Sequence, residues 1–417
     1  MHGSAAAIPH QTLRRMFSTR TDWDLRPSPL YSLLQQKRAR GEEVLDLTES
    51  NPTKCGFIHS SSALIDSGSL QRSVLYEPDP QGLLSARQAI ADWYKHQSIN
   101  VDPGRIVLAS STSEAYSFLF RLLCNVGDVV AVPKPSYPLF EYLAHLNDIL
   151  CQQYRLAYDG EWHIDLSSVD DALSSNAETL ILVHPNNPTG SFVKKDERDR
   201  VVSEALARNI PIIVDEVFSA FSFLDDARCA ESFAGTSSTL TFTINGLSKL
   251  LGLPQMKLAW IVVSGPDEEC EKAVQRLEVI ADTYLSVGTL VQQALSRLLN
   301  DTEAMTGKIL ARTKNNYEFL RTACTAGSSA TLFRCEGAWN AILRLPEKKS
   351  DEEWAREILQ SAGVLTHPGH LFDIDMKACI VLSLLPEQRV FSEGVTKILT
   401  LIGQAGENVT GDRLSSG

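Results

Sequence analysis

The sequence predicts an α/β protein, with a large domain built on a mainly parallel sheet and a smaller α+β domain. Short apolar runs alternate with longer helical patterns from about residue 105 to residue 265. Several of these runs are continuous rather than alternating, which is typical of strands covered by helices on both faces. From about Thr283 the pattern changes to long helices followed by short strands, which indicates the second domain.

Six apolar runs account for the strands predicted in the large domain. They are Arg105–Ala109, Val129–Val132, Thr179–Val183, Ile210–Val214, Leu240–Ile244 and Leu258–Val263. Helical patterns such as Glu114–Leu123 and Lys195–Ala207 lie between them. This order favours parallel pairing, because a parallel crossover needs a connection long enough to hold a helix.

The smaller domain is predicted from longer helices and a few short strands. Its helices are Val291–Leu299, Asp301–Thr322 and Asp351–Ser361, and its strands include Ala341–Leu345 and Ile380–Leu384. We expect residues 50–290 to form the large domain and residues 21–49 with 291–405 to form the small one. Residues 1–20, which carry three arginines and no acid, are predicted to be a disordered leader, and the polar residues 406–417 a frayed tail.

Composition excludes several classes of protein. The chain has 417 residues, a mass of 46.0 kDa, 43% hydrophobic and 22% charged residues and a net charge of −12. These values exclude a disulfide scaffold, a fibrous repeat and a disordered chain. No apolar run approaches the roughly 20 residues that cross a bilayer, and the acidic charge offers no footprint for nucleic acid or an anionic membrane. The eight scattered cysteines predict reduced thiols, a cytoplasmic protein and no metal site.

Five polar segments follow predicted strands, at the edge where open α/β sheets bind ligands. Three of them are residues 110–114 (SSTSE), 135–138 (PSYP) and 184–190 (HPNNPTG). The first has capping-box spacing between Ser111 and Glu114, and a helix N-terminus there suits a phosphate, although most such caps bind no ligand. The second presents Tyr137 on a stiff turn, or simply packs it on the surface, and the third presents amide side chains or forms an ordinary Asn-Pro turn.

The other two segments carry a carboxylate and an amine. Asp215 ends an apolar strand, so a buried carboxylate there needs a cationic partner, unless it is only a solvated helix cap. Lys249 follows another strand within Asn245–Lys249. A lysine among apolar residues has a lowered pKa and can act as a nucleophile, although most loop lysines are merely solvated.

Together these segments resemble the fold-type I pyridoxal-phosphate enzymes, in particular the class I/II aminotransferases. The motifs that carry the resemblance are NNPTG (186–190), DEVF (215–218), SK followed by GLPQMK (248–257), GLLSAR (82–87) after Tyr76, and HPG (367–369). The resemblance runs from about Leu45 to Ile402 and implies a mainly parallel seven-stranded sheet. It also implies pyridoxal 5'-phosphate as cofactor, an amino donor and a 2-oxo acid as substrates, and a role in a biosynthetic process.

The resemblance implies roles for the residues that match these motifs. Lys249 would form a Schiff base with the cofactor and then move a proton, and Asp215 would pair with the protonated pyridine nitrogen. Asn187 would donate to the cofactor's phenolic oxygen and would also contact the substrate, and Tyr137 would stack on the ring. The residues implied to hold the phosphate are Ser111, Thr112, Ser248, Lys257 and the Tyr76 of a neighbouring subunit in a homodimer. Residues 283–286 would also approach the neighbour's site.

Departures from the family pattern put the substrate in doubt. Lys257 and Phe218 stand where the family usually has Arg and Tyr. Val381 stands where an arginine usually binds the substrate carboxylate, and no arginine lies between Asp375 and Gln388. Candidate replacements are Arg26, Lys54 and Arg344. The loop expected to face the substrate has Ser50 in place of the usual Gly, followed by Asn51.

Several functions therefore stay open. The leading prediction is an aminotransferase for a small amino acid or amine, and the alternative is a pyridoxal-phosphate lyase, decarboxylase or racemase. A catalytically silent relative is disfavoured because Lys249, Asp215 and Asn187 are all present. A nicotinamide-dependent dehydrogenase is set aside because no G-x-G-x-x-G follows a predicted strand.

Overall fold

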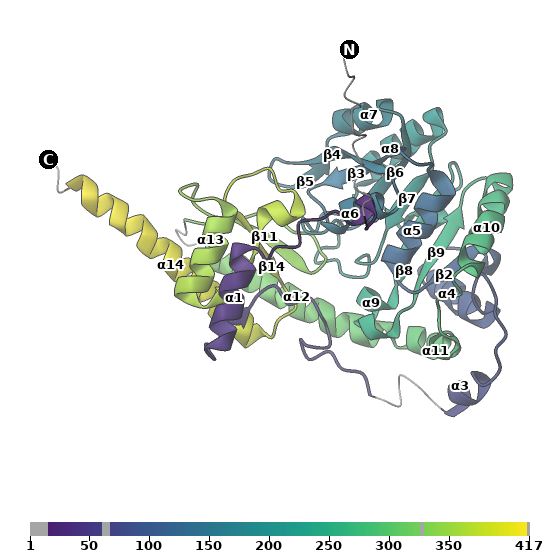
Figure 1. Ribbon diagram of the computed structural model, residues 1–417, viewed down its shortest axis with the longest axis horizontal. Coiled ribbons are helices and arrows are strands. Elements are labelled where there is room, and N and C mark those ends of the chain that lie inside the picture. The colour runs from purple at the N-terminus through teal and green to yellow at the C-terminus, as the bar shows by residue number, and fades with distance from the viewer. Residues whose placement is uncertain (1–15, 61–66, 326–328, 415–417) are drawn as a thin grey trace, which may run out of the picture.

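A computed structural model describes residues 16–60, 67–325 and 329–414 of the chain (Figure 1). These residues include an eight-stranded sheet in the order β2-β9-β8-β7-β6-β3-β4-β5. Its strands are β2 (Ile106–Ala109), β3 (Val129–Lys134), β4 (Leu150–Tyr158), β5 (Trp162–Ile164), β6 (Ala177–Val183), β7 (Ile212–Asp215), β8 (Thr241–Gly246) and β9 (Ala259–Ser264). Within this described sheet, β9 and β5 run against the other strands. The predicted α/β class is confirmed, with eight strands in place of seven.

The two strands missing from the predicted set are β4 and β5. In β4 the pattern of burial is irregular, and only Tyr154 is fully buried. A search for continuous apolar runs overlooks such a strand, since one of its faces is only partly covered. β5 then adds an antiparallel edge, pairing Trp162 with Tyr158 and Ile164 with Leu156.

Helices cover both faces of this sheet (Figure 1). One face carries α5 (Thr112–Leu123), α6 (Leu139–Leu146) and α10 (Asp267–Asp282), which share a core cluster with β2, β8 and β9. The other face carries α7 (Leu166–Ser174) and α8 (Lys195–Arg208), which pack on β3, β6 and β7. The long connections leave the carboxyl ends of the parallel strands at one edge of the sheet.

The small domain is built on a four-stranded sheet in the order β10-β11-β14-β13 within the described residues. Its strands are β10 (Thr331–Leu332), β11 (Asn340–Arg344), β13 (His367–Pro368) and β14 (Cys379–Ser383). β1 (Leu45–Asp46) pairs with β12 (Val364–Leu365), which attaches the N-terminal segment to this domain. α1 (Pro29–Ala39) lies against α13 (Asp351–Glu357), which continues as a π-helical turn over Ile358–Ala362.

Long helices join the two domains. α11 (Thr289–Asn300) packs on α4 (Leu84–His96), and α12 (Thr302–Thr325) continues into the small domain to pack on α14 (Gln388–Leu414). The tail expected to fray from residue 406 instead continues α14 to Leu414, with no proline to stop it. A short helix, α3 (Ser67–Arg72), lies at the edge of the large domain (Figure 1).

Part of the predicted leader is attached to the large domain. Residues 1–15 lie outside the described residues, but Thr19–Thr21 form a 3₁₀ turn. Arg20 forms an ion pair with Asp148, and His145 contacts the carbonyl oxygen of Thr19 at 3.1 Å. Residues 18–20 of the predicted leader thus lie against the large domain.

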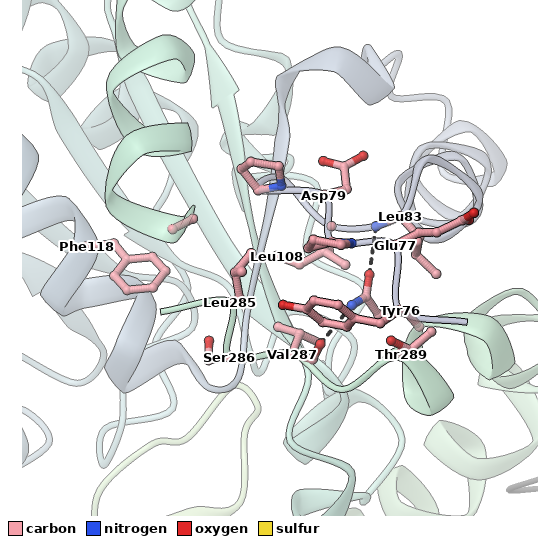
Figure 2. A pocket seen from close by; sticks show the side chains of 15 residues that line it. Tyr76, Glu77, Asp79, Leu83, Leu108, Phe118, Leu285, Ser286, Val287 and Thr289 are labelled. Carbon is pink, nitrogen blue, oxygen red and sulfur yellow. Dashed lines mark hydrogen bonds between the residues drawn. The ribbon is translucent and has the colours of Figure 1, made fainter. Parts of the chain in front are cut away.

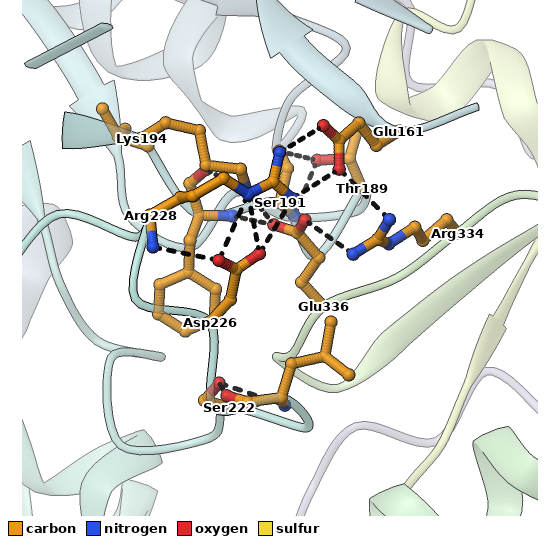
Figure 3. A network of polar contacts seen from close by, with 12 residues as sticks. Glu161, Thr189, Ser191, Lys194, Ser222, Asp226, Arg228, Arg334 and Glu336 are labelled. Atoms are coloured by element: carbon orange, nitrogen blue, oxygen red, sulfur yellow. Dashed lines mark hydrogen bonds and ion pairs between the residues drawn. The ribbon is translucent and has the colours of Figure 1, made fainter. Parts of the chain in front are cut away.

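A buried ion pair crosses from the large domain to the small one (Figure 3). Lys194, just before α8, pairs with Glu336, between β10 and β11, and both side chains are almost completely buried. Arg334 Nη1 forms an ion pair with Glu161 Oε2 at 3.1 Å. Arg228 donates two hydrogen bonds to the Glu161 carboxylate, at 2.8 and 3.0 Å. This network fixes the small domain beside the loop that follows β6.

Candidate active site

Three predicted polar residues come from neighbouring strands at the centre of the large sheet. Asn187 follows β6, Asp215 ends β7 and Lys249 lies in α9 (Leu247–Leu250), directly after β8. β6, β7 and β8 are adjacent and parallel, so these residues meet at one edge of the sheet. The structure therefore brings together the amide, the carboxylate and the amine, as the sequence predicts.

Asp215 is a carboxylate in an apolar environment. Burial raises its pKa to about 6, and three favourable contacts with the charged form oppose that rise. The Val217 N–H donates to its Oδ1 at 3.1 Å, the Tyr116 hydroxyl donates to its Oδ2 at 3.2 Å, and the Lys249 ammonium attracts it. A carboxylate that burial destabilises to this extent is suited to face a positive charge on a ligand.

Lys249 has the complementary electrostatics. Its pKa is lowered because burial disfavours the ammonium form, and the charge of Asp215 only partly opposes that effect. Its Nζ lies 5.7 Å from the ring centre of Phe218 and 5.1 Å from that of Trp339. A lowered pKa increases the fraction of neutral amine, which is the nucleophilic form.

In residues 184–190, some side chains hold the loop together and one faces the site. Asn186 is buried, donates to the Pro135 carbonyl and accepts from Thr189, so it builds the loop. Asn187 instead accepts a hydrogen bond at its Oδ1 from Asn340 Nδ2, at 2.6 Å. Burial lowers the pKa of His184 to about 4, and its Nδ1 accepts from the Val193 N–H, so this histidine is structural.

The two acidic residues of DEVF, Asp215 and Glu216, also differ in role: one faces the site and the other is structural. Glu216 is buried on the opposite side from Asp215, where it accepts from the Ser232 hydroxyl at 2.6 Å and from the Phe233 N–H at 2.7 Å. Burial raises its pKa to about 7. Successive residues of an extended strand point to opposite faces, so only Asp215 faces the site.

The predicted phosphate residues are spread over three elements. Ser111 caps α5 by accepting from the Glu114 N–H at 3.2 Å, and Thr112 is the first residue of that helix. Glu114 in turn accepts from the Ser110 N–H, one residue before the cap, at 2.6 Å. Ser248 lies beside Lys249 in α9, while the Lys257 side chain is exposed and its backbone is left-handed, with φ of 51°.

Tyr137 lies on the loop after β3, next to the loop that carries Asn187. Its side chain is about half exposed, and its pKa is raised by burial and by the negative charge of Asp215. Ser50 and Asn51 lie farther along the edge and use their polar atoms locally. Ser50 Oγ donates to the Thr48 carbonyl at 3.2 Å, and Asn51 Oδ1 accepts from Thr53.

The position predicted for a carboxylate-binding arginine is apolar. Val381 is fully buried in β14, in a cluster with Trp162, Ile342 and Phe372. Of the candidate replacements, Arg26 is exposed and bonded to Asp24, and Arg344 lies at the far end of β11, opposite Cys379. Lys54 lies 3.4 Å from Glu49 on the N-terminal loop.

Tyr76 lies apart from this group, on the surface of the large domain (Figure 2). It borders a small pocket together with Leu285 and Ser286, which belong to the second segment predicted to meet a neighbouring subunit. Its chain neighbours Val74 and Leu75 are also exposed, and other exposed apolar side chains of the large domain are Leu70, Leu84 and Val279. The structure thus places the two predicted intersubunit segments side by side.

Sequence patterns missed three residues of the site: Tyr116, Trp339 and Asn340. Tyr116 lies on the buried face of α5, and its hydroxyl reaches Asp215 only through the packing of that helix on the sheet. Trp339 and Asn340 come from the small domain, about 90 residues or more from their partners in sequence. A Trp-Asn pair within EGAWN (336–340) at the start of a strand carries no local signal for a site.

The described residues contain neither a metal-ligand cluster nor a membrane-spanning helix. No cluster of three or more His, Cys, Asp or Glu side chains there could hold a metal ion. No helix among those residues is long and apolar enough to span a membrane.

The chain matches the family model of class I and II aminotransferases over residues 42–390 and belongs to that family. It is similar to the glutamate-pyruvate aminotransferase AlaA of Haemophilus influenzae, with 24% identity over 90% of this chain and 94% of that protein. It is also similar to the alanine aminotransferase of Mycobacterium tuberculosis, with 23% identity over 89% and 88% of the two chains.

Solved structures show the same fold. An aminotransferase from Escherichia coli superposes with a TM-score of 0.83 and 23% identity, covering 94% of this chain and 98% of that one. The alanine aminotransferase from Pyrococcus furiosus also gives a TM-score of 0.83, with 20% identity over 91% of this chain and all of that one. The protein is therefore an aminotransferase with the fold-type I architecture.

The partly buried carboxylate predicts a pH-dependent cost in stability. A raised acid pKa stabilises the fold at low pH, and this contribution is lost as the pH rises through the folded pKa. Asp215→Asn should therefore stabilise the protein without cofactor by about 2 kcal/mol more at pH 8 than at pH 4, from a pKa near 6 against 3.8 unfolded. Urea unfolding of both cofactor-free proteins at the two pH values measures this difference. If the two proteins differ in unfolding free energy by the same amount at pH 4 and pH 8, Asp215 has an ordinary pKa.

Proposed function

We propose that this aminotransferase uses pyridoxal 5'-phosphate, held at the edge of the large sheet between Asp215 and Lys249. The observation that carries the proposal is the pairing of a partly buried carboxylate of raised pKa with a partly buried amine of lowered pKa. The set of side chains fits that cofactor, because its ring nitrogen can carry the positive charge that Asp215 needs and its aldehyde needs a neutral amine. When bound, the cofactor supplies this aldehyde and an electron-withdrawing ring.

Each residue has a distinct task in this proposal. Lys249 holds the cofactor covalently and, once the amino donor has taken its place, is the base near the donor's α-carbon. Asp215 keeps the ring nitrogen protonated, and Tyr116 keeps the Asp215 carboxylate in position. Asn187 directs its free N–H groups to the phenolic oxygen, because Asn340 occupies its Oδ1. Tyr137 covers one face of the ring.

The phosphate is assigned to the segment that begins α5, with contributions from other elements. Ser111 and Thr112 lie at the N-terminus of this helix, where unpaired N–H groups favour an anion. Ser248 is next to Lys249, and Lys257 supplies a positive charge. Lysine acts as a point charge here, without the two-pronged hydrogen bonding of an arginine.

We further propose that the site is completed across a homodimer. Tyr76 is highly exposed, and within the described residues it forms no hydrogen bond or ring contact with Asn187, Asp215 or Lys249. The exposed apolar side chains beside it in the chain suit a surface that a second copy covers. Residues 283–286 form part of the same surface and would approach the partner's site.

The substrates proposed are a small amino acid and a 2-oxo acid. The relatives' names specify alanine, or glutamate with pyruvate, so alanine and glutamate are the first donors to test. We also propose a cytoplasmic location, which is supported by eight cysteines that all lie in the described part of the chain and are all free thiols.

The buried Val381 favours one alternative, a lyase, decarboxylase or racemase that uses the same cofactor. The orientation of the substrate over the ring decides which bond breaks, and the missing arginine removes one determinant of that orientation. A transaminase needs a 2-oxo acid to complete its cycle and releases no ammonia. Ammonia or carbon dioxide released without a 2-oxo acid would favour the alternative.

The covalent role of Lys249 predicts a specific chemical product. Borohydride reduction of the enzyme loaded with pyridoxal phosphate should fix the cofactor to the peptide that contains Lys249, as mass spectrometry of a digest would show. Lys249→Ala should lose the adduct and at least 10²–10⁴-fold of turnover, the usual contribution of a general base. Lys257→Ala is the matched control and should keep the adduct. An adduct on another lysine, or none, would refute the proposal.

The shared site predicts complementation between two defective subunits. Tyr76→Ala should weaken cofactor binding about 10- to 100-fold, as expected when a hydrogen bond to a charged group worth about 1.5–3 kcal/mol is lost. A heterodimer of Tyr76→Ala with Lys249→Ala subunits should recover one native site, because Tyr76 from one chain would complete Lys249 of the other.

Separately tagged subunits, co-expressed and purified through both tags, allow this measurement. The control is a heterodimer of wild-type and Lys249→Ala subunits, which also has one native Lys249 site. Equal turnover in the two heterodimers is expected. A complementing heterodimer as inactive as its parents would place Tyr76 in its own subunit's site.

A further inference from the structure

One face of the small-domain sheet is directed toward Asn187. Asn340 lies opposite Ser383 in the antiparallel pair of β11 and β14, and Ile342 lies opposite Val381. Directly opposed residues and residues two apart in a strand share a face, so these four side chains form one surface. Asn340 contacts Asn187 at 2.6 Å, so this end of the surface meets the candidate active site. Ile342 and Val381 are buried in the cluster with Trp162 and Phe372, and all four members are uncharged.

The cations nearest this surface lie beyond its two ends, and in the described part of the chain none of them is hydrogen-bonded to Asn187 or Asn340. Arg344 shares the face, but it lies four residues beyond Asn340, about 13 Å along the strand at 3.3 Å per residue. At the other end, Arg312 donates to the carbonyl oxygen of Leu385, two residues beyond Ser383, at 3.4 Å, and Lys54 Nζ lies 3.4 Å from Glu49 Oε2. The Glu49 carbonyl accepts from Ser383 at 2.8 Å, so this ion pair is attached to the same surface and has no net charge.

The two asparagines form an amide pair with unused hydrogen-bonding groups. Asn340 donates one Nδ2 hydrogen to Asn187, which leaves it one N–H and its Oδ1. Asn187 has two Nδ2 hydrogens, of which the proposed function assigns one to the cofactor's phenolic oxygen and leaves one. The pair can therefore offer both donors and an acceptor. A carboxylate uses only the donors, whereas a carboxamide can use the donors and the acceptor.

We propose that Asn187 and Asn340 form a neutral subsite for the group on the donor's α-carbon, and that this subsite accepts an α-carboxamide as readily as an α-carboxylate. The inference rests on the proposed function and extends it to α-amino amides as donors. An arginine would favour the carboxylate strongly, because charge-assisted hydrogen bonds are roughly twice as strong as neutral ones. Asn340 is then the residue that determines specificity, in a position that sequence patterns did not single out.

The transfer balances in the same way for both donors. The donor carbon loses its C–H and C–N bonds and becomes a carbonyl, whose oxygen comes from water. The amino group, a proton and the electron pair pass to the carbonyl carbon of a 2-oxo acid, whose oxygen leaves as water. An α-amino amide and a 2-oxo acid thus give a 2-oxo amide and an amino acid.

A matched pair of donors tests the subsite. L-Alanine and L-alaninamide differ in the charge of one group and little in size. Each is titrated against the holoenzyme, and the change in the cofactor's visible absorbance gives an apparent dissociation constant. The values are compared at equal concentrations of unprotonated amine, since the two amines have different pKa values. We expect dissociation constants within tenfold of each other, and a tenfold or greater preference for alanine would overturn the proposal.

A substitution of the same shape tests the role of Asn340. Asn340→Asp adds a negative charge, which should weaken the binding of alanine at least tenfold more than the binding of alaninamide. Ser383→Ala is the control, because it removes a polar group from the residue opposite Asn340 without changing the charge. It should leave the ratio of the two constants unchanged. A ratio that is unaffected by Asn340→Asp would overturn the proposal.

A negative result can be assigned to one proposal or the other. If the holoenzyme carries its cofactor on Lys249 and responds to neither compound, the neutral subsite is refuted while the cofactor site stands. If the chain takes up no pyridoxal phosphate, the proposed function fails as well. The comparison in the wild-type holoenzyme decides the question even if a variant does not fold.

Discussion

The whole site depends on a carboxylate that burial makes unstable as an anion. Asp215 ends a strand that is covered on both faces, and its pKa rises to about 6 even though Tyr116, Val217 and Lys249 all favour the charged form. Such a group is costly in the free protein and is suited to bind a cation. The same burial lowers the pKa of Lys249, so one apolar environment prepares both the acid and the amine.

The small domain completes the site, although it contributes no charge to its centre. Trp339 lies against Lys249, and Asn340 holds the amide of Asn187 by its oxygen. The buried pair of Lys194 and Glu336 joins the two domains near the loop that carries Asn187 (Figure 3). Any shift of the small domain would therefore alter both the position of the amide and the surroundings of the amine.

Sequence reasoning located the residues whose signal is local. Asn187, Asp215 and Lys249 each follow an apolar run, and the parallel order of β6, β7 and β8 is enough to predict that they meet. It missed β4 because only one residue of that strand is fully buried. It also missed Tyr116, Trp339 and Asn340, because their partners are chosen by tertiary packing between a helix, or another domain, and the sheet. The sequence alone shows that Val381 replaces an arginine, whereas its burial opposite Ile342 depends on the pairing of β11 with β14.

The central claim is that Asp215 holds a positive charge on a bound ring, and ¹⁵N NMR of the holoenzyme tests it most directly. Pyridoxal phosphate labelled at its ring nitrogen is loaded into the wild type and into Asp215→Ala, and the shift of that nitrogen is followed from pH 6 to pH 9. The account predicts a protonated nitrogen throughout in the wild type and an unprotonated one in the variant. An unprotonated ring nitrogen in the wild type at neutral pH would contradict it.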